Sequence, residues 1–139
     1  KAIGVSNYGE HHLDKMRSYA TLMPAVNQIE VHPWLQRNAL RTATEAVGAT
    51  VMAYSPLARG HKVDDPLLVK IAGKLGCTPA QVAIKWCLDA GCITVPKSSN
   101  PRRIEENLGS LKVNLSTQIE ELQALDENYI SGWDPTSEA

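Results

Sequence analysis

The feature that most constrains the fold of this chain is an alternation of short apolar runs with longer segments of helical periodicity. The apolar runs are expected to be strands, at residues 2–6, 25–31, 50–54 and 92–96. The helical patterns lie at residues 9–20, 38–47, 67–75, 78–90, 101–108 and 116–125. Strands that alternate with helices are typical of βα units around a parallel sheet. The sequence therefore predicts an α/β fold of about four parallel βα units, followed by C-terminal helices.

Capping residues predict where three of the helices begin. Residues 78–81 read Thr-Pro-Ala-Gln, which is a capping box with Pro at the first helical position. Asn100 precedes a further helix, whose Ile104 and Leu108 are expected to face the core. Ser116 is expected to cap the last helix.

Composition excludes several classes of function. A chain of 139 residues with 43% hydrophobic residues is long enough for one soluble domain with a core. Its 14 Lys+Arg against 15 Asp+Glu give a net charge of -1, which provides no basic field for a nucleic-acid partner. No window approaches the ~20 apolar residues that a bilayer helix needs, so no membrane partner is expected.

The cysteine count and the first residues bear on the cellular context. Three cysteines, Cys77, Cys87 and Cys92, are an odd number in a chain of this size, which favours a reducing compartment and a cytoplasmic location. The chain begins without Met, inside an apolar run, so we expect it to be a fragment of a longer protein.

Two architectures build parallel sheets of this kind. A doubly wound dinucleotide-binding fold places Gly-x-Gly-x-x-Gly after its first strand, whereas residues 4–9 read Gly-Val-Ser-Asn-Tyr-Gly and do not match. A (βα)8 barrel places its active site at the carboxyl ends of its strands. Polar residues follow the apolar runs of this chain at those ends, so we favour half of a (βα)8 barrel.

The segment 95–108 has the chemistry of a phosphate site. It runs from a strand end through a tight loop into a helix, where free N–H groups of the first turn and the helix dipole would attract an anion. Lys97 adds a positive charge, Ser98 a hydroxyl, and Arg103 a guanidinium that can bind an anion through two hydrogen bonds. An ordinary capped helix with a solvated basic end explains the same spacing equally well.

Four ordered motifs, at residues 4–7, 27–33, 53–57 and 95–98, each stand at the end of an expected strand. Together they resemble the aldo-keto reductase family, and the resemblance covers essentially the whole chain. It matches the C-terminal half of that family's barrel. It implies that residues 1–139 form a single C-terminal half-barrel carrying most of an NADP(H) site, with residues 128–139 as a C-terminal tail.

The resemblance also implies which residues contact the cofactor. They are Ser6, Asn7 and Gln28 for the nicotinamide carboxamide, Tyr54 for stacking on the nicotinamide ring, Ser55 and Leu57 for the pyrophosphate, Lys97, Ser98 and Arg103 for the 2′-phosphate, and Glu106 and Asn107 for the adenine. Structural interpretations stay open beside these roles. Ser6 or Asn7 could cap the following helix, Gln28 could satisfy a buried strand, and Tyr54 could belong to the core.

For the full-length protein, the resemblance implies NADPH-dependent reduction of a small aldehyde or ketone by hydride transfer. The family's catalytic Asp, Tyr, Lys and His lie on strands outside the matched half, so no catalytic residue is assigned and the 139-residue chain alone is expected to be inactive. The histidines lack ligand-like spacing, so no metal site is expected.

An open half-barrel would expose sheet edges and apolar side chains, so a missing N-terminal half or a second copy of the chain is the expected partner. Two alternatives are a non-catalytic nucleotide-binding or interaction module, and a proteolytic or cloning fragment without a role of its own.

Overall fold

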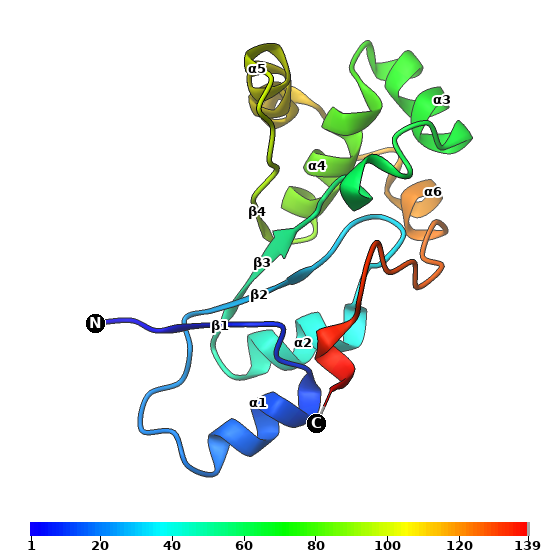
Figure 1. Cartoon of the computed structure of the whole chain (residues 1–139). Helices are drawn as coiled ribbons and strands as arrows, with labels where there is room; N and C mark the ends of the chain where they lie inside the picture. Colours follow the sequence, from blue (N-terminus) through cyan, green and yellow to red (C-terminus); the bar gives the residue numbers. More distant parts are fainter. Residues whose placement is uncertain (139) are drawn as a thin grey trace.

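The computed structural model describes residues 1–138, and its centre is a four-stranded parallel sheet (Figure 1). The strands are β1 (Gly4–Ser6), β2 (Val26–Glu30), β3 (Thr50–Tyr54) and β4 (Ile93–Thr94), in the order β1-β2-β3-β4. The helices are α1 (Glu10–Arg17), α2 (Asn38–Ala46), α3 (Pro66–Leu75), α4 (Pro79–Asp89), α5 (Pro101–Gly109) and α6 (Ile119–Gln123). Short 3-10 helices are η1 (Ala58–Gly60), η2 (Ser110–Lys112) and η3 (Pro135–Ser137). The predicted α/β fold of four parallel units is confirmed.

The core lies between one face of the sheet and the helices. Ile29 of β2 and Val51 of β3 are fully or almost fully buried against Leu13 of α1, Leu40 of α2 and Val82 of α4. Because side chains alternate along a strand, the next residues point to the opposite face. The parallel register places Gln28 beside Met52, and Met52 beside Ile93, in one row on that opposite face.

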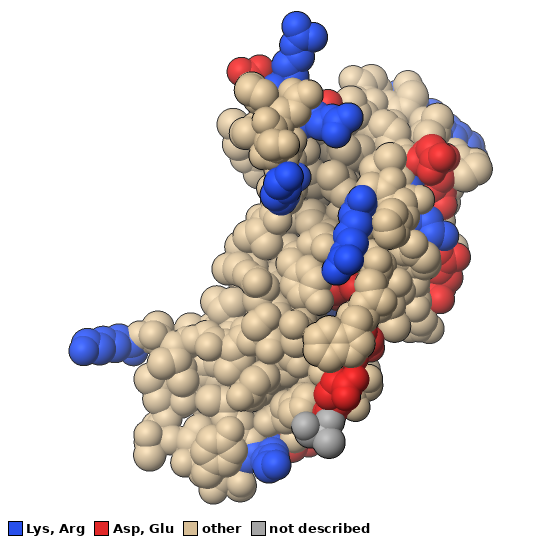
Figure 2. Space-filling view, viewed as in Figure 1, with Lys and Arg blue, Asp and Glu red and all other residues tan. Residues whose placement is uncertain are grey.

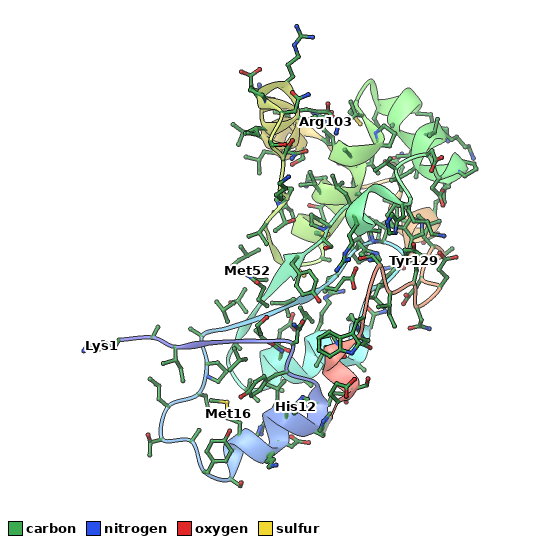
Figure 3. All side chains as sticks on the ribbon, in the orientation of Figure 1. Lys1, His12, Met16, Met52, Arg103 and Tyr129 are labelled. Carbon is green, nitrogen blue, oxygen red and sulfur yellow. The ribbon has the colours of Figure 1, made fainter. Side chains whose placement is uncertain are left out.

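The opposite face of the sheet is open. Ile93 is 42% exposed and Val95, just after β4, is 39% exposed. Met52, labelled in Figure 3, lies on this open side. Figure 2 shows a broad area over the strands that is almost free of Lys, Arg, Asp and Glu. Within residues 1–138, the sheet is thus fully covered on one face and only partly covered on the other.

Two expectations about the C-terminal helices are wrong. Ile104 and Leu108 do not face the core, because they are 53% and 68% exposed. The reason is that α5 contacts α4 and η2, while no described element covers its apolar stripe. Ser116 does not cap α6, since the helix begins only after Gln118 and the Ser116 N–H donates to the Asn114 side chain in a local turn.

Strand lengths also differ from the expected ranges. The strand expected at residues 2–6 begins at Gly4, and the strand expected at 92–96 is reduced to Ile93–Thr94. Both are edge strands with one described neighbour each. Single backbone hydrogen bonds, from Ala25 N–H to the Ile3 carbonyl and from Val95 N–H to the Ala53 carbonyl, continue the pairing just beyond their ends. The two central strands match their expected positions within one residue.

The C-terminal tail returns to the start of the chain (Figure 1). Ser131 donates from its backbone N–H and its hydroxyl to the Glu30 carboxylate at the end of β2. Asp134 accepts two hydrogen bonds from Arg37, at 3.0 and 2.7 Å. The Nε2 of His11 in α1 lies 2.8 Å from the Glu138 carbonyl oxygen. The expected tail 128–139 is therefore docked through residue 138, and residue 139 lies outside the described part.

Within residues 1–138, no single helix is long and apolar enough to cross a bilayer. Only α3 and α4 taken together have the length and composition, and a 91° bend separates them.

Candidate functional site

A cavity of about 910 Å³ opens at the carboxyl ends of β3 and β4. Its walls come from the turn after β3, the start of α4, and the segment that leads from β4 into α5. Seven residues that the sequence singled out line it: Ser55, Leu57, Lys97, Ser98, Arg103, Glu106 and Asn107. The fold thus brings both expected phosphate-binding segments, 53–57 and 95–108, to one hollow.

The cavity carries an excess of positive charge. Arg59, Lys97 and Arg103 line it, against the single carboxylate of Glu106. Figure 2 shows Lys and Arg side chains around the hollow between α5 and the β3–α3 connection, and Figure 3 places Arg103 on α5 beside it. Cationic side chains that converge on one hollow suit a ligand with phosphate groups.

The first turn of α5 offers fewer free amides than the sequence suggested. Pro101 has no N–H, Arg102 donates its N–H to the Asn100 side chain at 3.0 Å, and Ile104 donates to the Asn100 carbonyl at 3.1 Å. Ser98 accepts the Asn100 N–H at 3.1 Å. Anion binding here therefore depends mainly on the side chains of Lys97 and Arg103, and less on a row of free N–H groups.

A second group of residues, Ser6, Asn7 and Gln28, lies together at the ends of β1 and β2. The Asn7 N–H donates to the Gln28 carbonyl at 2.8 Å, and the Ser6 hydroxyl donates to the same oxygen at 3.1 Å. Asn7 adopts a left-handed backbone with φ of 59°. Its side-chain Oδ1 is buried and has no hydrogen-bond partner among the described residues. An unpaired buried acceptor of this kind is suited to an N–H from a ligand amide.

Tyr54 stands between the two groups, at the end of β3, and is half-buried. Burial raises the pKa of its phenol above the ordinary value, and the nearby Glu30 carboxylate raises it further. Burial also acts to raise the pKa of Glu30, but hydrogen bonds from His32 and Ser131 outweigh it and keep that pKa below its ordinary value. A neutral phenol beside an ionised carboxylate is the result at neutral pH.

Six cavity residues were missed by the sequence analysis: Arg59, Gly60, Val63, Thr78, Pro79 and Ala80. Arg59 follows the turn after β3, where its backbone is left-handed with φ of 55°. It belongs to no sequence motif that predicts a binding site. Thr78, Pro79 and Ala80 form the start of α4. Their capping-box signal predicted a helix start correctly, with Thr78 accepting from the Gln81 N–H at 3.2 Å, but gave no sign that the helix start lines a cavity.

The cavity and the group of Ser6, Asn7 and Gln28 together form one elongated candidate site. Ser6, Asn7 and Gln28 offer amide-binding groups at one end, and the cationic cavity lies at the other. No cluster of three or more His, Cys, Asp or Glu side chains in residues 1–138 could hold a metal ion. The arrangement suits a long organic anion that carries an amide at one end and phosphates towards the other.

Comparison with known proteins gives a consistent result. A model of the aldo/keto reductase family matches residues 1–129. An uncharacterised oxidoreductase of Schizosaccharomyces pombe is 42% identical over 137 residues, which cover 97% of this chain and 50% of that protein. A glyoxal reductase of Bacillus subtilis is 38% identical over 136 residues, covering 97% of this chain and 49% of that protein.

Solved structures of aldo-keto reductases also resemble this chain. An aldo-keto reductase from a Medee basin deep-sea metagenome library superposes with a TM-score of 0.90 at 29% identity, covering 98% of this chain and 52% of that one. The chain thus spans about half the length of the relatives it matches. The expected half of a (βα)8 barrel is confirmed by this overlap.

Proposed function

The chain belongs to the aldo/keto reductase family of oxidoreductases, and on that premise we propose that it is the NADPH-binding half of an enzyme that reduces a small aldehyde or ketone. The cationic cavity between the β3 turn and α5 is the observation that carries this proposal. An unpaired amide acceptor on Asn7, at the other end of the site, supports it.

The proposal gives each group of residues a task. Ser6, Asn7 and Gln28 hold and orient the nicotinamide carboxamide, whose N–H groups meet the unpaired Oδ1 of Asn7. The neutral phenol ring of Tyr54 stacks on the nicotinamide and excludes water from one face of it. Bound NADPH supplies the hydride.

Three basic side chains carry the phosphate end of the proposed site. Arg59 faces the cavity beside Ser55 and Leu57, where the pyrophosphate would lie. Lys97 and Arg103 lie on the other wall, with Ser98, and bind the 2′-phosphate. Glu106 and Asn107, one turn further along α5, receive the adenine.

Substrate, activity and location are part of the same proposal. The glyoxal reductase of Bacillus subtilis suggests a small carbonyl compound as the substrate class. A carbonyl reduction also needs a general acid, and we assign none to this chain, so the chain by itself binds nucleotide without turnover. Its three cysteines are free thiols, which supports a reducing, cytoplasmic location.

A titration with two neighbouring arginines tests cofactor choice. Arg103 lines the cavity, whereas Arg102 is exposed beside it and does not. Charge-assisted hydrogen bonds contribute about 1.5–3 kcal/mol, so Arg103→Ala should weaken NADPH binding at least about ten-fold and leave NADH binding nearly unchanged. Arg102→Ala, the matched control, should change neither.

Nucleotide fluorescence on titration into the 139-residue chain is the measurement. An equal loss of NADPH and NADH affinity in Arg103→Ala would show that Arg103 does not read the 2′-phosphate. No binding of either nucleotide by the unaltered chain would contradict the proposed function itself.

A further inference from the structure

We propose that Thr78, at the start of α4, is a positioning residue that fixes the Glu106 carboxylate for recognition of a 6-amino purine. The inference rests on the proposed nucleotide site and adds to it a determinant of base specificity that lies outside α5. Thr78 and Glu106 both line the cavity and both are half-buried.

Hydrogen bonds between α4 and α5 carry the inference. The Thr78 hydroxyl donates to Oε1 of Glu106 at 2.7 Å. The side-chain amide of Gln81 donates to the Glu106 carbonyl at 2.8 Å. Gly109 lies against this contact, since a Cβ there would lie only 2.5 Å from Nε2 of Gln81. The start of α4 thus holds both the backbone and the side chain of Glu106.

The direction of each hydrogen bond at Thr78 is determined. Its hydroxyl has one proton, and a carboxylate can only accept, so that proton belongs to the bond with Glu106. The hydroxyl oxygen is then left to accept the Gln81 N–H, which lies 3.2 Å away. The Thr78 N–H donates to Oε1 of Gln81 at 3.0 Å, which completes the capping box. The helix cap and the carboxylate orientation therefore depend on the same hydroxyl.

This arrangement has a consequence for ligand choice. Thr78 occupies Oε1 of Glu106, and Oε2 of Glu106 has no partner among the described residues, so it is available to accept a hydrogen bond in the cavity. The 6-amino group of adenine donates hydrogen bonds, whereas the 6-oxo group of hypoxanthine only accepts them. A carboxylate held in place should therefore favour adenine and repel hypoxanthine.

The test compares NADPH with its hypoxanthine analogue, in which the adenine amino group is replaced by oxygen. The unaltered chain should bind NADPH about ten-fold or more tighter than the analogue. Thr78→Val, which keeps the shape but removes the hydroxyl, should reduce this ratio several-fold. Thr78→Ser, which restores a hydroxyl, should return the ratio towards its original value.

A second variant separates base recognition from helix capping. Gly is well tolerated at an N-cap, so Thr78→Gly keeps the helix start but has no hydroxyl to donate to Glu106. It should fold like the unaltered chain by circular dichroism and still lose the preference for NADPH over the analogue. Taking the ratio of the two affinities removes any effect of the variant on contacts that both nucleotides share.

The outcomes are distinct. An unchanged ratio in Thr78→Gly would overturn the role of Thr78, even if Thr78→Val proved too unstable to study. A ratio near one in the unaltered chain, with NADPH still bound, would overturn base recognition by Glu106. Absence of binding by both nucleotides in the unaltered chain would instead refute the proposed function on which the inference rests.

Discussion

Gly9 lies where the tail packs against the beginning of α1. It is buried and precedes that helix, and its N–H donates to Nδ1 of His12 at 2.9 Å. A Cβ at this position would lie 2.1 Å from the Thr136 carbonyl oxygen, a distance that no real contact allows. Because the obstacle is backbone, a larger side chain at Gly9 can be accommodated only if the tail moves.

We therefore expect Gly9→Ala to lower the free energy of unfolding by about 1–3 kcal/mol, the usual cost of overpacking. Gly73 in α3 is the matched control, because a Cβ there meets nothing within 4 Å among the described residues. Gly73→Ala should raise stability by up to about 1 kcal/mol, since Ala favours a helix. Denaturant unfolding measures both, and equal effects of the two substitutions would contradict this account.

At the scale of residues, sequence motifs located most of the candidate site. They identified the seven predicted residues that line the cavity and the three that meet at β1 and β2, although the roles of these residues in binding remain predictions. Arg59 and Thr78 were not predicted as cavity residues, because the cavity walls come from segments that are distant in sequence. Neither hydrophobic periodicity nor capping rules predict which distant segments lie close together. The sequence also could not predict that Oδ1 of Asn7 is buried without a hydrogen-bond partner, because the burial of one atom depends on the packed fold.

The side chain of Asp65 anchors the beginning of α3. The Asp65 side chain accepts the N–H groups of Leu67 and Leu68 at 2.9 and 3.3 Å through Oδ1. Through Oδ2 it accepts the indole N–H of Trp34 at 3.1 Å. Trp34 is only 1% exposed, so its N–H depends on this acceptor. One carboxylate thus caps α3 and satisfies a core side chain.

Asp65→Ala should lower the free energy of unfolding by about 2–4 kcal/mol, which combines a lost helix cap with an unpaired buried donor. Asp64→Ala is the control with the same change in charge, because Asp64 is exposed and makes no hydrogen bond to the described residues through its side chain. It should shift stability by less than about 0.5 kcal/mol. If thermal melts of the two variants coincide, Asp65 is not the anchor of α3.

At the scale of elements, capping and periodicity predicted where helices start but not what covers them. Thr78 and Asn100 marked the beginnings of α4 and α5 correctly. The apolar stripe of Ile104 and Leu108 predicted a buried face, yet a stripe specifies only the side of a helix that avoids water. Whether a neighbour covers that side depends on the tertiary arrangement, and none of the described elements does so.

At the scale of the whole molecule, the open face of the sheet leaves apolar side chains exposed that a partner could cover. Ile93 is 42% exposed on it, and β1 and β4 have no second neighbour among the described strands. In a (βα)8 barrel such a face is filled by side chains of other strands. We therefore expect the pure chain to associate with a second copy of itself.

Ile93→Lys places a charge on this face and should shift the chain towards monomer in sedimentation velocity at micromolar concentration. Leu108→Lys, on the exposed stripe of α5, is the control and should leave the sedimentation coefficient unchanged. A compact monomer for the unaltered chain, melting cooperatively, would contradict the need for a partner.

The docked tail also orders the steps by which the chain folds. Ser6 and Gln28 in neighbouring strands are separated by 22 residues, whereas His11 and Glu138 are separated by 127. Loop-closure entropy grows as (3/2)RT ln n, so joining the two ends costs about 1.5 kcal/mol more than joining β1 to β2. Contacts of long sequence separation slow folding. We therefore expect the sheet to form first and the meeting of α1 with the last residues to be the late kinetic step.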